Sequence, residues 1–428
     1  MDNRNFGLDT LALHAGFSGD PGEGSTEVPI HATSAYHFSS TEQARELFEL
    51  KASGNIYSRI SNPTVTVLEE RIAALEDGTG AVAFSSGHAA MFSAMLCLAE
   101  AGDEIISSIN IYGGAINMFA ITLGNLGIKV RFVSGNNPAD WEALVTPKTK
   151  AFFLEAVGNP NANVADLSAV GAVAKKHGIP FIVDSTFTTP ALLRPKEWGA
   201  DIIIHSATKF LCGHGNSLAG LAVDCGTFNF LGNPRFPKYN TPDVSYHGTV
   251  FARDFAAAPF ATRLRCLFLR DLGGCLSPFN AYLVLLGMET LSLRMARHCE
   301  NALTVAKYLA ANPDISFVSY PALPDAKDYS LVQKYLGGRG GAVFTFGLCG
   351  GREAGGKFID SLQLIGNVAN VGDTKTQVIH PATTTHSQLD AAQLAASGIT
   401  EQTIRISVGL ETVSDLIADI EQAIAKTK

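Results

Sequence analysis

The stretch 201-DIIIHSATKF-210 decides how this chain folds. Its run of three isoleucines is β-branched and apolar, which is typical of a strand buried inside a sheet. Lys209 follows directly, so its amine should lie at the carboxyl end of the strand and partly out of water. A lysine that loses solvation can be neutral, and a neutral amine can form a Schiff base with an aldehyde. Taken alone, Lys209 would more often be a surface residue in the loop after a strand, so the rest of the chain has to decide.

Between about residues 65 and 265, apolar strands alternate with segments of helical length. The expected strands are AVAF at 81–84, DEIISSI at 103–109, KVRFVS at 129–134, KAFFLEAV at 150–157, IPFIVDS at 179–185 and DIIIHS at 201–206. Alternation of this kind predicts an α/β fold whose mostly parallel central sheet is covered by helices on both faces. In such a sheet the functional site lies at the carboxyl ends of the strands.

The composition divides the chain into three regions. Residues 1–64 are polar, glycine-rich and irregular, and indicate an arm that covers another surface. Residues 65–270 are expected to form the main α/β domain. Within that domain the stretch 225–265 is rich in proline, asparagine and aromatic residues, and it should be an ordered loop over a cleft or an interface. Residues 271–428 combine a helix-like stretch at 276–309 with a second alternation, which predicts a smaller α+β domain.

The composition also argues for a small-molecule partner. The 32 Lys and Arg residues against 40 Asp and Glu residues give a formal charge of −8 without long runs of one sign, so neither nucleic acid nor a membrane surface is an expected partner. The chain lacks a signal-like N-terminus and an apolar run of about 18 residues, and we expect a cytoplasmic protein. The seven cysteines are scattered and never spaced as CxxC, which favours reduced thiols over a zinc site.

Three familiar motifs are incomplete in this sequence. GREAGGKF at 351–358 has the spacing of a phosphate-binding loop, but Phe358 stands where the magnesium-binding hydroxyl belongs. No G-x-G-x-x-G opens a helix after the first strand, which argues against the hypothesis of a dinucleotide-dependent oxidoreductase. His380 and His386 bracket PATTT without a carboxylate at ligand spacing, so we expect no metal there.

Complementary chemistry stands at the ends of the expected strands. Gly87 and His88 lie where the first strand passes into a helix, and backbone amides at a helix N-terminus readily hold an anion. Asp184 ends another strand as a buried carboxylate, which needs a cationic or N–H partner. With Lys209, these groups match what pyridoxal phosphate requires: donors for its phosphate, a carboxylate for its pyridine nitrogen and an amine for its aldehyde. Tyr112, just after the second strand, is placed to stack on the flat ring.

A set of short motifs occurs in the order found in one known family. They are YSRISNPT at 57–64, SSGHAA at 85–90, YGG at 112–114, VDSTF at 183–187, SATKF at 206–210, YHG at 246–248, LSPFNA at 276–281, HPATTTH at 380–386 and RISVGLE at 405–411. On these motifs, which span nearly the whole chain, the sequence resembles the Cys/Met-metabolism family of pyridoxal-phosphate-dependent enzymes, and within it the O-acetylhomoserine sulfhydrylase branch. The resemblance implies pyridoxal-phosphate fold type I, the aspartate-aminotransferase-like fold, with the cofactor in the domain at 65–270. It also implies a homotetramer, a dimer of dimers whose sites are shared between subunits through the arm at 1–64.

The resemblance further implies a role for each residue that matches a family motif. Lys209 would carry the Schiff base and shuttle protons, assisted by Tyr57 or Tyr112 as acid and base. The cofactor-binding residues would be Gly87, His88, Tyr112, Asp184, Ser206, Thr208 and Lys209, together with Tyr57 and Arg59 of the neighbouring subunit. Arg405 would grip the substrate α-carboxylate, because a planar guanidinium fork suits that group. Asn159 would lie near the phenolic oxygen of the cofactor and the substrate carboxylate, and Thr376 would contact the carboxylate.

The reaction implied by this branch is a γ-replacement, in which sulfide or methanethiol displaces acetate from O-acetyl-L-homoserine and gives homocysteine or methionine. The alternatives are a cystathionine γ-synthase, a methionine or cystathionine γ-lyase, and a catalytically silent binding protein of the same fold. His88 and Lys375 stand where the lyases and cystathionine synthases carry methionine and glutamate, and Gly114 replaces the cysteine of methionine γ-lyases. Lys375 is expected to favour an anionic nucleophile such as hydrosulfide. The sequence leaves open whether the acyl group is acetyl or succinyl and which sulfur donor is natural.

Overall fold

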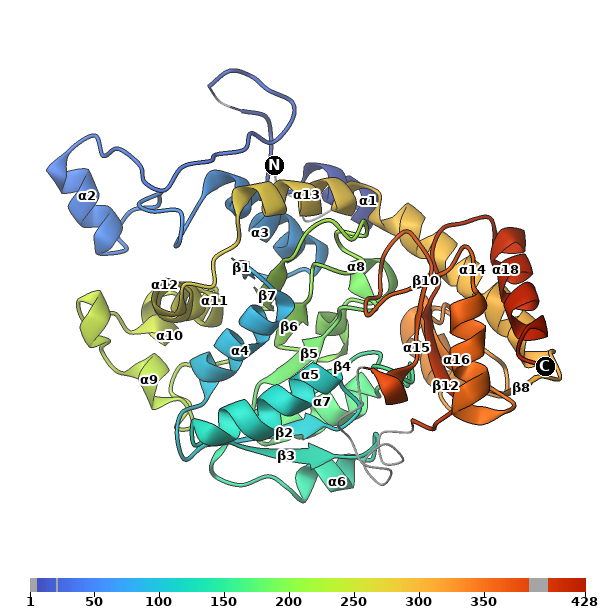
Figure 1. Ribbon diagram of the computed structural model, residues 1–428. Helices are drawn as coiled ribbons and strands as arrows, with labels where there is room; N and C mark the ends of the chain where they lie inside the picture. Colours follow the sequence, from blue (N-terminus) through green and yellow to red (C-terminus); the bar gives the residue numbers. More distant parts are fainter. Residues whose placement is uncertain (1–5, 21, 385–398) are drawn as a thin grey trace.

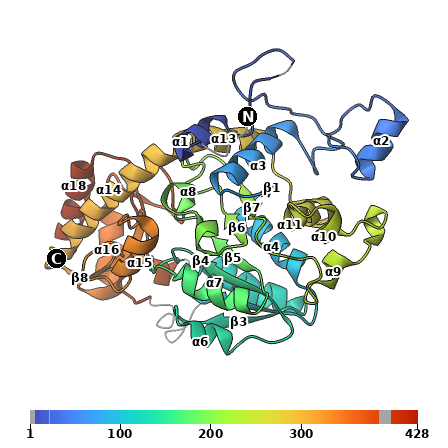
Figure 2. The same ribbon diagram turned by 180° about the vertical axis from the view of Figure 1, so that it is seen from behind.

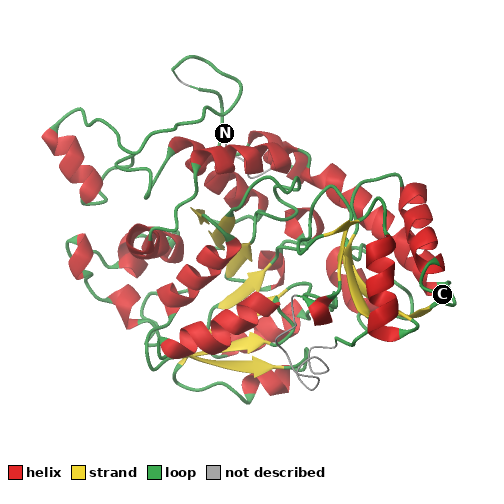
Figure 3. Cartoon of the chain, in the orientation of Figure 1, coloured by secondary structure: helices red, strands yellow, loops and turns green. Residues whose placement is uncertain are grey.

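The computed structural model describes residues 6–20, 22–384 and 399–428, which form two β-sheets with their covering helices (Figure 1). The larger sheet has seven strands in the order β1-β7-β6-β5-β4-β2-β3, and the smaller has five in the order β10-β11-β12-β9-β8. Figure 3 shows the strands of both sheets in yellow. The arrangement confirms the predicted α/β fold with a mostly parallel central sheet and a second, smaller sheet. The predicted region boundaries at 64 and 270 stay a prediction.

The large sheet is parallel except for one strand. Its strands are β1 Gly80–Phe84, β2 Glu104–Ser108, β3 Lys129–Val133, β4 Thr149–Glu155, β5 Phe181–Asp184, β6 Ile202–His205 and β7 Gly220–Asp224. β7 runs antiparallel to its neighbours β1 and β6, and the other pairs are parallel. The carboxyl ends of β1, β2, β4, β5 and β6 therefore meet at one edge of the sheet.

β7 is the one strand of the large sheet that the sequence pattern did not predict. It is joined to β6 by turns alone, at 206–219, because an antiparallel neighbour needs no helical crossover. The turn segment returns the chain past Lys209 and seals the sheet between β1 and β6.

Both faces of the large sheet are buried, because its strands send apolar side chains alternately to each face. Ile203 packs into the core on one face, and Ile202 and Ile204 pack on the other. The first face is covered by α3 Pro63–Leu75, α7 Leu167–Lys176 and α13 Pro278–Glu289, and the second by α4 Gly87–Leu98, α5 Gly113–Asn117 and α11 Pro259–Arg263. α4 and α5 lie on the near side in Figure 1, and α7 lies on the near side in Figure 2.

Helix α4 begins directly at the functional edge of the large sheet. The Ser86 hydroxyl accepts a hydrogen bond from the Ala89 N–H at 3.1 Å and so caps the helix. The N–H groups of Gly87 and His88 have no acceptor within the helix, since an α-helix leaves its first donors unpaired. They remain available to an anion.

The small sheet is mainly antiparallel and packs against four helices. Its strands are β8 Ile315–Ser319, β9 Val343–Leu348, β10 Gly366–Asn367, β11 Gln377–Ile379 and β12 Thr403–Ser407. The helices are α14 Leu291–Ala310, α15 Tyr329–Leu336, α16 Gly351–Ser361 and α18 Val413–Ala425. The helix-like stretch predicted at 276–309 is two helices, α13 and α14, which are separated at Thr290.

The N-terminal segment extends away from the two sheets (Figures 1 and 2). α1 Leu8–His14 packs near α3, whereas α2 Thr41–Phe48 stands apart from the sheets in both views. Shorter helical segments complete the described chain: α6 Pro138–Glu142, α8 Thr189–Leu192, α9 Pro237–Asn240, α10 Phe251–Asp254, α12 Arg270–Leu272, the π-helical turns Met118–Leu123 and Leu264–Leu269, and the 3₁₀ turns Pro195–Trp198, Val244–Tyr246 and Pro381–Thr383. Several of these turns fall within 225–265, so the predicted ordered loop has helical turns of its own.

The incomplete motifs have structural roles. GREAGGKF at 351–358 lies within α16, where Lys357 pairs with Glu353 at 3.2 Å, so it forms no phosphate-binding loop. His380 is buried and hydrogen-bonded, and His386 lies outside the described residues. In the part of the chain that the structure describes, no three His, Cys, Asp or Glu side chains gather to hold a metal ion, and no helix is both long and apolar enough to cross a membrane.

Candidate active site

The strand ends of the large sheet and one edge of the small sheet enclose a pocket of about 310 Å³. The residues that line it are Ser86, Gly87, His88, Met91, Tyr112, Glu155, Val157, Asn159, Asp184, Thr186, Phe187, Ser206, Thr208, Lys209, Leu218, Ala369, Asn370, Val371 and Arg405. Nine of the twelve predicted site residues are among them. Tyr57, Arg59 and Thr376 are not.

Lys209 reaches into this pocket from the turn after β6. Its ammonium donates a hydrogen bond to the side-chain oxygen of Asn370, in the loop after β10. Burial lowers the pKa of Lys209 to about 8, and the nearby cation of Arg405 acts in the same direction. The amine is therefore a far better nucleophile and proton acceptor near neutral pH than an ordinary lysine.

A cradle for an anion lies beside the lysine. Gly87 is so close to Ser206 that an added Cβ would come within 2.6 Å of the Ser206 Cβ. Because no real Cβ tolerates that distance, glycine alone lets the start of α4 approach the end of β6. The hydroxyl of Thr208 donates to the Ala219 carbonyl and accepts from its N–H, at 3.2 and 3.0 Å, which fixes this wall of the cradle.

Asp184 and Glu155 form a buried acidic pair at neighbouring strand ends. They are paired residues of the parallel strands β5 and β4. Burial raises the pKa of both, but the Asp184 carboxylate accepts from the Thr186 N–H at 2.9 Å, which opposes the rise. Burial and then the charge of Asp184 raise the pKa of Glu155 well above its ordinary value. Glu155 is therefore the more readily protonated of the two carboxyl groups.

Thr186 connects this acidic pair to the segment that follows β6 and carries Lys209. Its hydroxyl accepts a hydrogen bond from the Ser206 N–H at 2.8 Å and is itself bonded to Asp184. The position of the Asp184 carboxylate is therefore tied to the segment after β6 that carries Lys209.

Tyr112 places an aromatic ring over the open side of the pocket. Its backbone N–H donates to Glu155 Oε1 at 2.7 Å, which fixes the start of α5. The Tyr112 ring meets the ring of His88 edge-on, with 5.6 Å between the centroids. Tyr112 is 43% exposed and lines the pocket, so its ring is available to stack on a flat ligand.

Arg405 approaches the pocket from the small sheet. It lies on β12, and its Nη1 donates to Asn159 Oδ1 at 3.1 Å while its Nη2 donates to the Asn370 carbonyl at 3.2 Å. Burial lowers the pKa of Arg405 to about 10, so the side chain still carries its charge at neutral pH. No carboxylate of residues 6–20, 22–384 or 399–428 pairs with this guanidinium.

Three predicted residues lie away from the pocket of their own chain. Arg59 donates to the backbone carbonyl of Arg270, and its guanidinium lies 5.4 Å from the ring centre of Tyr57. The hydroxyl of Thr376 donates to Glu411 at 2.7 Å and accepts from the Gly409 N–H at 2.8 Å. Its hydrogen bonds are thus directed into the protein.

Lys375 also points away from the pocket. Its side chain is 78% exposed, and its Nζ lies 3.9 Å from Asp373. The structure therefore gives no support to the expected effect of Lys375 on the nucleophile within this subunit.

Several residues of the pocket were not assigned a role from the sequence, among them Asn370 and Glu155. Asn370 accepts from Lys209, from which it is 161 residues away along the chain, and no local pattern indicates such a contact. Glu155 could have been found, because it ends an apolar strand as Asp184 does, and polar residues at the ends of parallel strands are candidates for the site.

The pocket fits pyridoxal phosphate on the chemistry of its donors. Unpaired amides of Gly87 and His88 and the nearby Ser206 hydroxyl suit a phosphate, Asp184 suits a protonated ring nitrogen, and the Lys209 amine suits an aldehyde. An amine, a buried carboxylate and an anion cradle on one edge of this sheet define a pyridoxal-phosphate enzyme of fold type I.

The chain belongs to the Cys/Met metabolism PLP-dependent enzyme family, whose model matches residues 9–425. It is 49% identical over 420 residues to O-acetyl-L-homoserine sulfhydrylase 1 of Thermus thermophilus, with 98% of this chain and 100% of that one covered. An O-acetyl-L-homoserine sulfhydrylase of Corynebacterium glutamicum is 46% identical, with 99% of each chain covered.

A solved structure agrees with this family. A putative O-acetylhomoserine (thiol)-lyase from Campylobacter jejuni, which carries N'-pyridoxyl-lysine-5'-monophosphate, has a TM-score of 0.95 and 41% identity over 98% of this chain and 100% of that chain. The protein is thus a pyridoxal-phosphate-dependent enzyme, as the resemblance implied.

Proposed function

We propose that this enzyme is an O-acetylhomoserine sulfhydrylase, which replaces the acetyl group of O-acetyl-L-homoserine by sulfide or methanethiol and releases acetate. The observation that carries the proposal is the pocket shared by the Lys209 amine and the buried Arg405 guanidinium. A buried cation without a carboxylate partner is costly, and the α-carboxylate of an amino-acid substrate would relieve that cost. Relatives named sulfhydrylases, 46–49% identical over nearly the whole chain, support the choice of O-acetylhomoserine.

The residues of the pocket divide the work of holding the cofactor. The amides of Gly87 and His88 and the hydroxyl of Ser206 would hold the phosphate, with Thr208 beside them. Asp184 would face the ring nitrogen, and Tyr112 would stack on the ring. When bound, pyridoxal phosphate supplies an aldehyde that joins an amine and an electron-accepting ring that makes a Cα proton acidic.

Lys209 is the proposed proton carrier. With its pKa lowered to about 8, the free amine accepts a proton from the substrate Cα and can return it on the same side. Asn370 accepts a hydrogen bond from the ammonium form and keeps it pointed into the pocket. Tyr112, with Tyr57 of a neighbouring subunit, would assist at the carbon that loses acetate.

Arg405 is the proposed anchor for the substrate. Asn159 and the Asn370 carbonyl hold its guanidinium from two sides, so the plane of the fork is set before the substrate arrives. A planar fork binds a carboxylate through two parallel hydrogen bonds. Thr376 is left out of the proposed contacts, because its hydroxyl serves Glu411 and Gly409.

We also propose that two subunits share each site. Tyr57 and Arg59 lie outside the pocket of their own chain and belong to the extended N-terminal segment that Figures 1 and 2 show. In a homotetramer built as a dimer of dimers, these residues would complete the phosphate site of the neighbour. The free state of all seven cysteines supports the reducing cytoplasm as the compartment.

A product assay tests the proposed reaction. Purified holoenzyme with O-acetylhomoserine and sulfide should give homocysteine and acetate in equal amounts, and without sulfide it should give no α-ketobutyrate. Arg405→Lys should raise KM at least about tenfold, because one point charge replaces a bidentate fork. Release of α-ketobutyrate without sulfide would indicate a γ-lyase, and a faster reaction with cysteine than with sulfide would indicate a cystathionine γ-synthase. Either result would overturn the proposal.

A further inference from the structure

A second pocket lies at the far end of α4 from the cofactor pocket. The first residues of α4, Gly87 and His88, line the cofactor pocket, whereas its last turn, 96–98, lines the second pocket. The volume of about 330 Å³ lies at the lower end of the range for small-molecule sites. We call it the basic pocket, because its charged lining consists of the basic residues Lys150, Arg235, Lys238 and Arg263 and the acidic residues Glu100 and Asp103.

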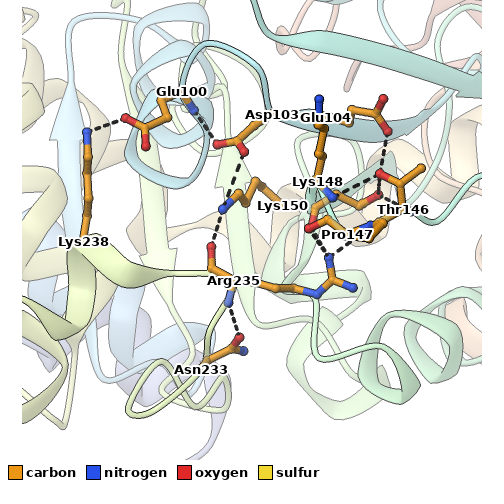
Figure 4. A network of polar contacts seen from close by, with 11 residues as sticks. Glu100, Asp103, Glu104, Thr146, Pro147, Lys148, Lys150, Asn233, Arg235 and Lys238 are labelled. Carbon is orange, nitrogen blue, oxygen red and sulfur yellow. Dashed lines mark hydrogen bonds and ion pairs between the residues drawn. The ribbon is translucent and has the colours of Figure 1, made fainter.

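The two lysines of the basic pocket already have acidic partners. Lys238 pairs with Glu100, and Lys150 Nζ lies 3.6 Å from Asp103 Oδ1. Figure 4 shows both pairs beside the backbone of Arg235. The acidic residues of the lining are therefore neutralised, and they leave the arginines without compensation.

The two arginines meet only neutral acceptors. Arg235 Nη1 donates to three backbone carbonyls of the loop 146–149, at distances of 2.9 to 3.1 Å. Arg263 Nη1 donates to the Cys97 carbonyl at 2.8 Å, and its buried Nε has no hydrogen-bond partner. Within the ranges that the structure describes, no carboxylate pairs with either guanidinium.

Arg263 is almost fully buried at the base of the basic pocket. Its guanidinium lies 5.0 and 5.4 Å from the ring centres of Tyr239 and Phe268, and Nη1 lies 3.7 Å from the Cys97 sulfur. Burial raises the pKa of the Cys97 thiol, so this sulfur is neutral. Rings, carbonyls and a neutral thiol soften the cost of a buried cation but do not cancel its charge. Among the described residues, the Arg263 guanidinium thus has no carboxylate at ion-pair distance.

The remaining walls of the basic pocket are apolar. Leu98, Ile128 and Phe236 line it and are buried. An inorganic anion would leave these walls unused, whereas a neutral apolar molecule would leave the guanidinium groups without a counter-charge. The lining thus suits a ligand that has both an anionic group and an apolar body.

We propose that the basic pocket binds a small organic anion, an apolar carboxylate. The carboxylate lies against the guanidinium groups of Arg235 and Arg263, and the apolar body packs on Leu98, Ile128 and Phe236. Because α4 runs from this pocket to the amides of the phosphate cradle, such a ligand contacts the same helix as the cofactor. The site is independent of the proposed substrate and of the identity of the sulfur donor.

Fluorine NMR of holoenzyme with 4-fluorobenzoate tests the site. The measurement uses the Arg405→Gln background, so that the substrate anchor contributes no second carboxylate site. We expect saturable broadening of the fluorine signal. The affinity derived from it should fall at least about tenfold in Arg235→Gln, because a charged hydrogen-bond partner is lost. Lys238→Gln, which leaves the contacts of Arg235 with its loop intact, should weaken binding by a smaller factor through the lost rim charge.

A matched variant and a matched ligand complete the test. Arg131 lies on β3, pairs with Glu104 at 2.9 Å and does not line the basic pocket. Arg131→Gln should therefore leave the binding of 4-fluorobenzoate unchanged. 4-Fluorobenzyl alcohol has the same apolar body without the charge and should not bind measurably. The proposal fails if 4-fluorobenzoate does not bind saturably, if Arg235→Gln binds it as the parent does, or if the alcohol binds equally well.

Discussion

The Lys209 amine owes its reactivity to two effects that both lower its pKa. Desolvation disfavours the ammonium form, and so does the nearby cation of Arg405. Both influences have a second purpose: β6 is buried because it is an interior strand of the large sheet, and Arg405 is the proposed anchor for the substrate carboxylate. The proposed substrate anchor, Arg405, and the Lys209 amine are thus electrostatically linked.

This link gives a pH prediction for capture of the cofactor by the apoprotein. Below a pH of about 8 Lys209 is protonated and cannot attack the aldehyde, so the capture rate should rise with pH and level off above that value. Arg405→Gln removes a charge that lowers the pKa of Lys209, so the midpoint should move to higher pH. Stopped-flow absorbance with pyridoxal phosphate measures it. An unchanged midpoint in Arg405→Gln, with surface Arg352→Gln as the control, would contradict the link.

Two substitutions of Asn370 should shift the pKa of Lys209 in opposite directions. Asn370→Asp places a carboxylate where the Lys209 ammonium now meets an amide oxygen, and an opposite charge should raise the pKa of Lys209 by about 1–3 units. Asn370→Ala removes the acceptor and should lower that pKa instead. The same capture measurement should therefore show midpoints on opposite sides of the parent value. Midpoints that move in the same direction would show that Asn370 acts on Lys209 only through packing.

At the scale of elements, the start of α4 lies so close to the segment after β6 that only glycine fits at position 87. Gly87→Ala would bring a Cβ within 2.6 Å of Ser206, and overpacking of this kind costs about 1–3 kcal/mol. The helix start must withdraw, so we expect pyridoxal phosphate to dissociate roughly tenfold more easily or worse. Equilibrium dialysis measures the affinity.

Gly124→Ala is the matched control for this prediction. Gly124 is helical, and a Cβ there would meet nothing within 4 Å, so cofactor affinity should stay as it is and stability should stay equal or rise by about 0.5–1 kcal/mol. If Gly87→Ala retained its cofactor as well as Gly124→Ala does, the fitted contact would not matter for binding.

The elements that carry the chemistry were predictable because their signals are local. The isoleucine run before Lys209, the apolar strand before Asp184 and the strand-to-helix passage at Gly87 each combine a structure and a functional group within a few residues. Asn370 had no such signal, since it reaches Lys209 only through the packing of the small sheet on the large one. The role predicted for Thr376 stays a prediction; in this structure its hydroxyl donates to Glu411, 35 residues away, a contact that no local pattern indicates.

At the scale of the whole molecule, the shared site predicts that defective subunits rescue one another. Lys209→Ala subunits lack the amine, and Arg59→Ala subunits lack the proposed phosphate contact given to a neighbour, so each homo-oligomer should be nearly inactive. After joint refolding, random pairing should restore roughly a quarter of the parental activity, because half of the dimers are hybrids with one intact site. The assay is homocysteine formation in the mixture. Activity equal to the sum of the two separate samples would show that Arg59 serves its own chain.

The hydrogen bond from Arg405 on β12 to Asn159 after β4 joins the small sheet to the large one across the pocket. The residues proposed to hold the cofactor, by contrast, follow the strands of the large sheet. If the contact between the two sheets loosened, the protein would retain the bound cofactor and its visible absorbance but would discriminate less well between amino-acid substrates. Along a denaturant series, discrimination between substrates should therefore decay before the visible absorbance does.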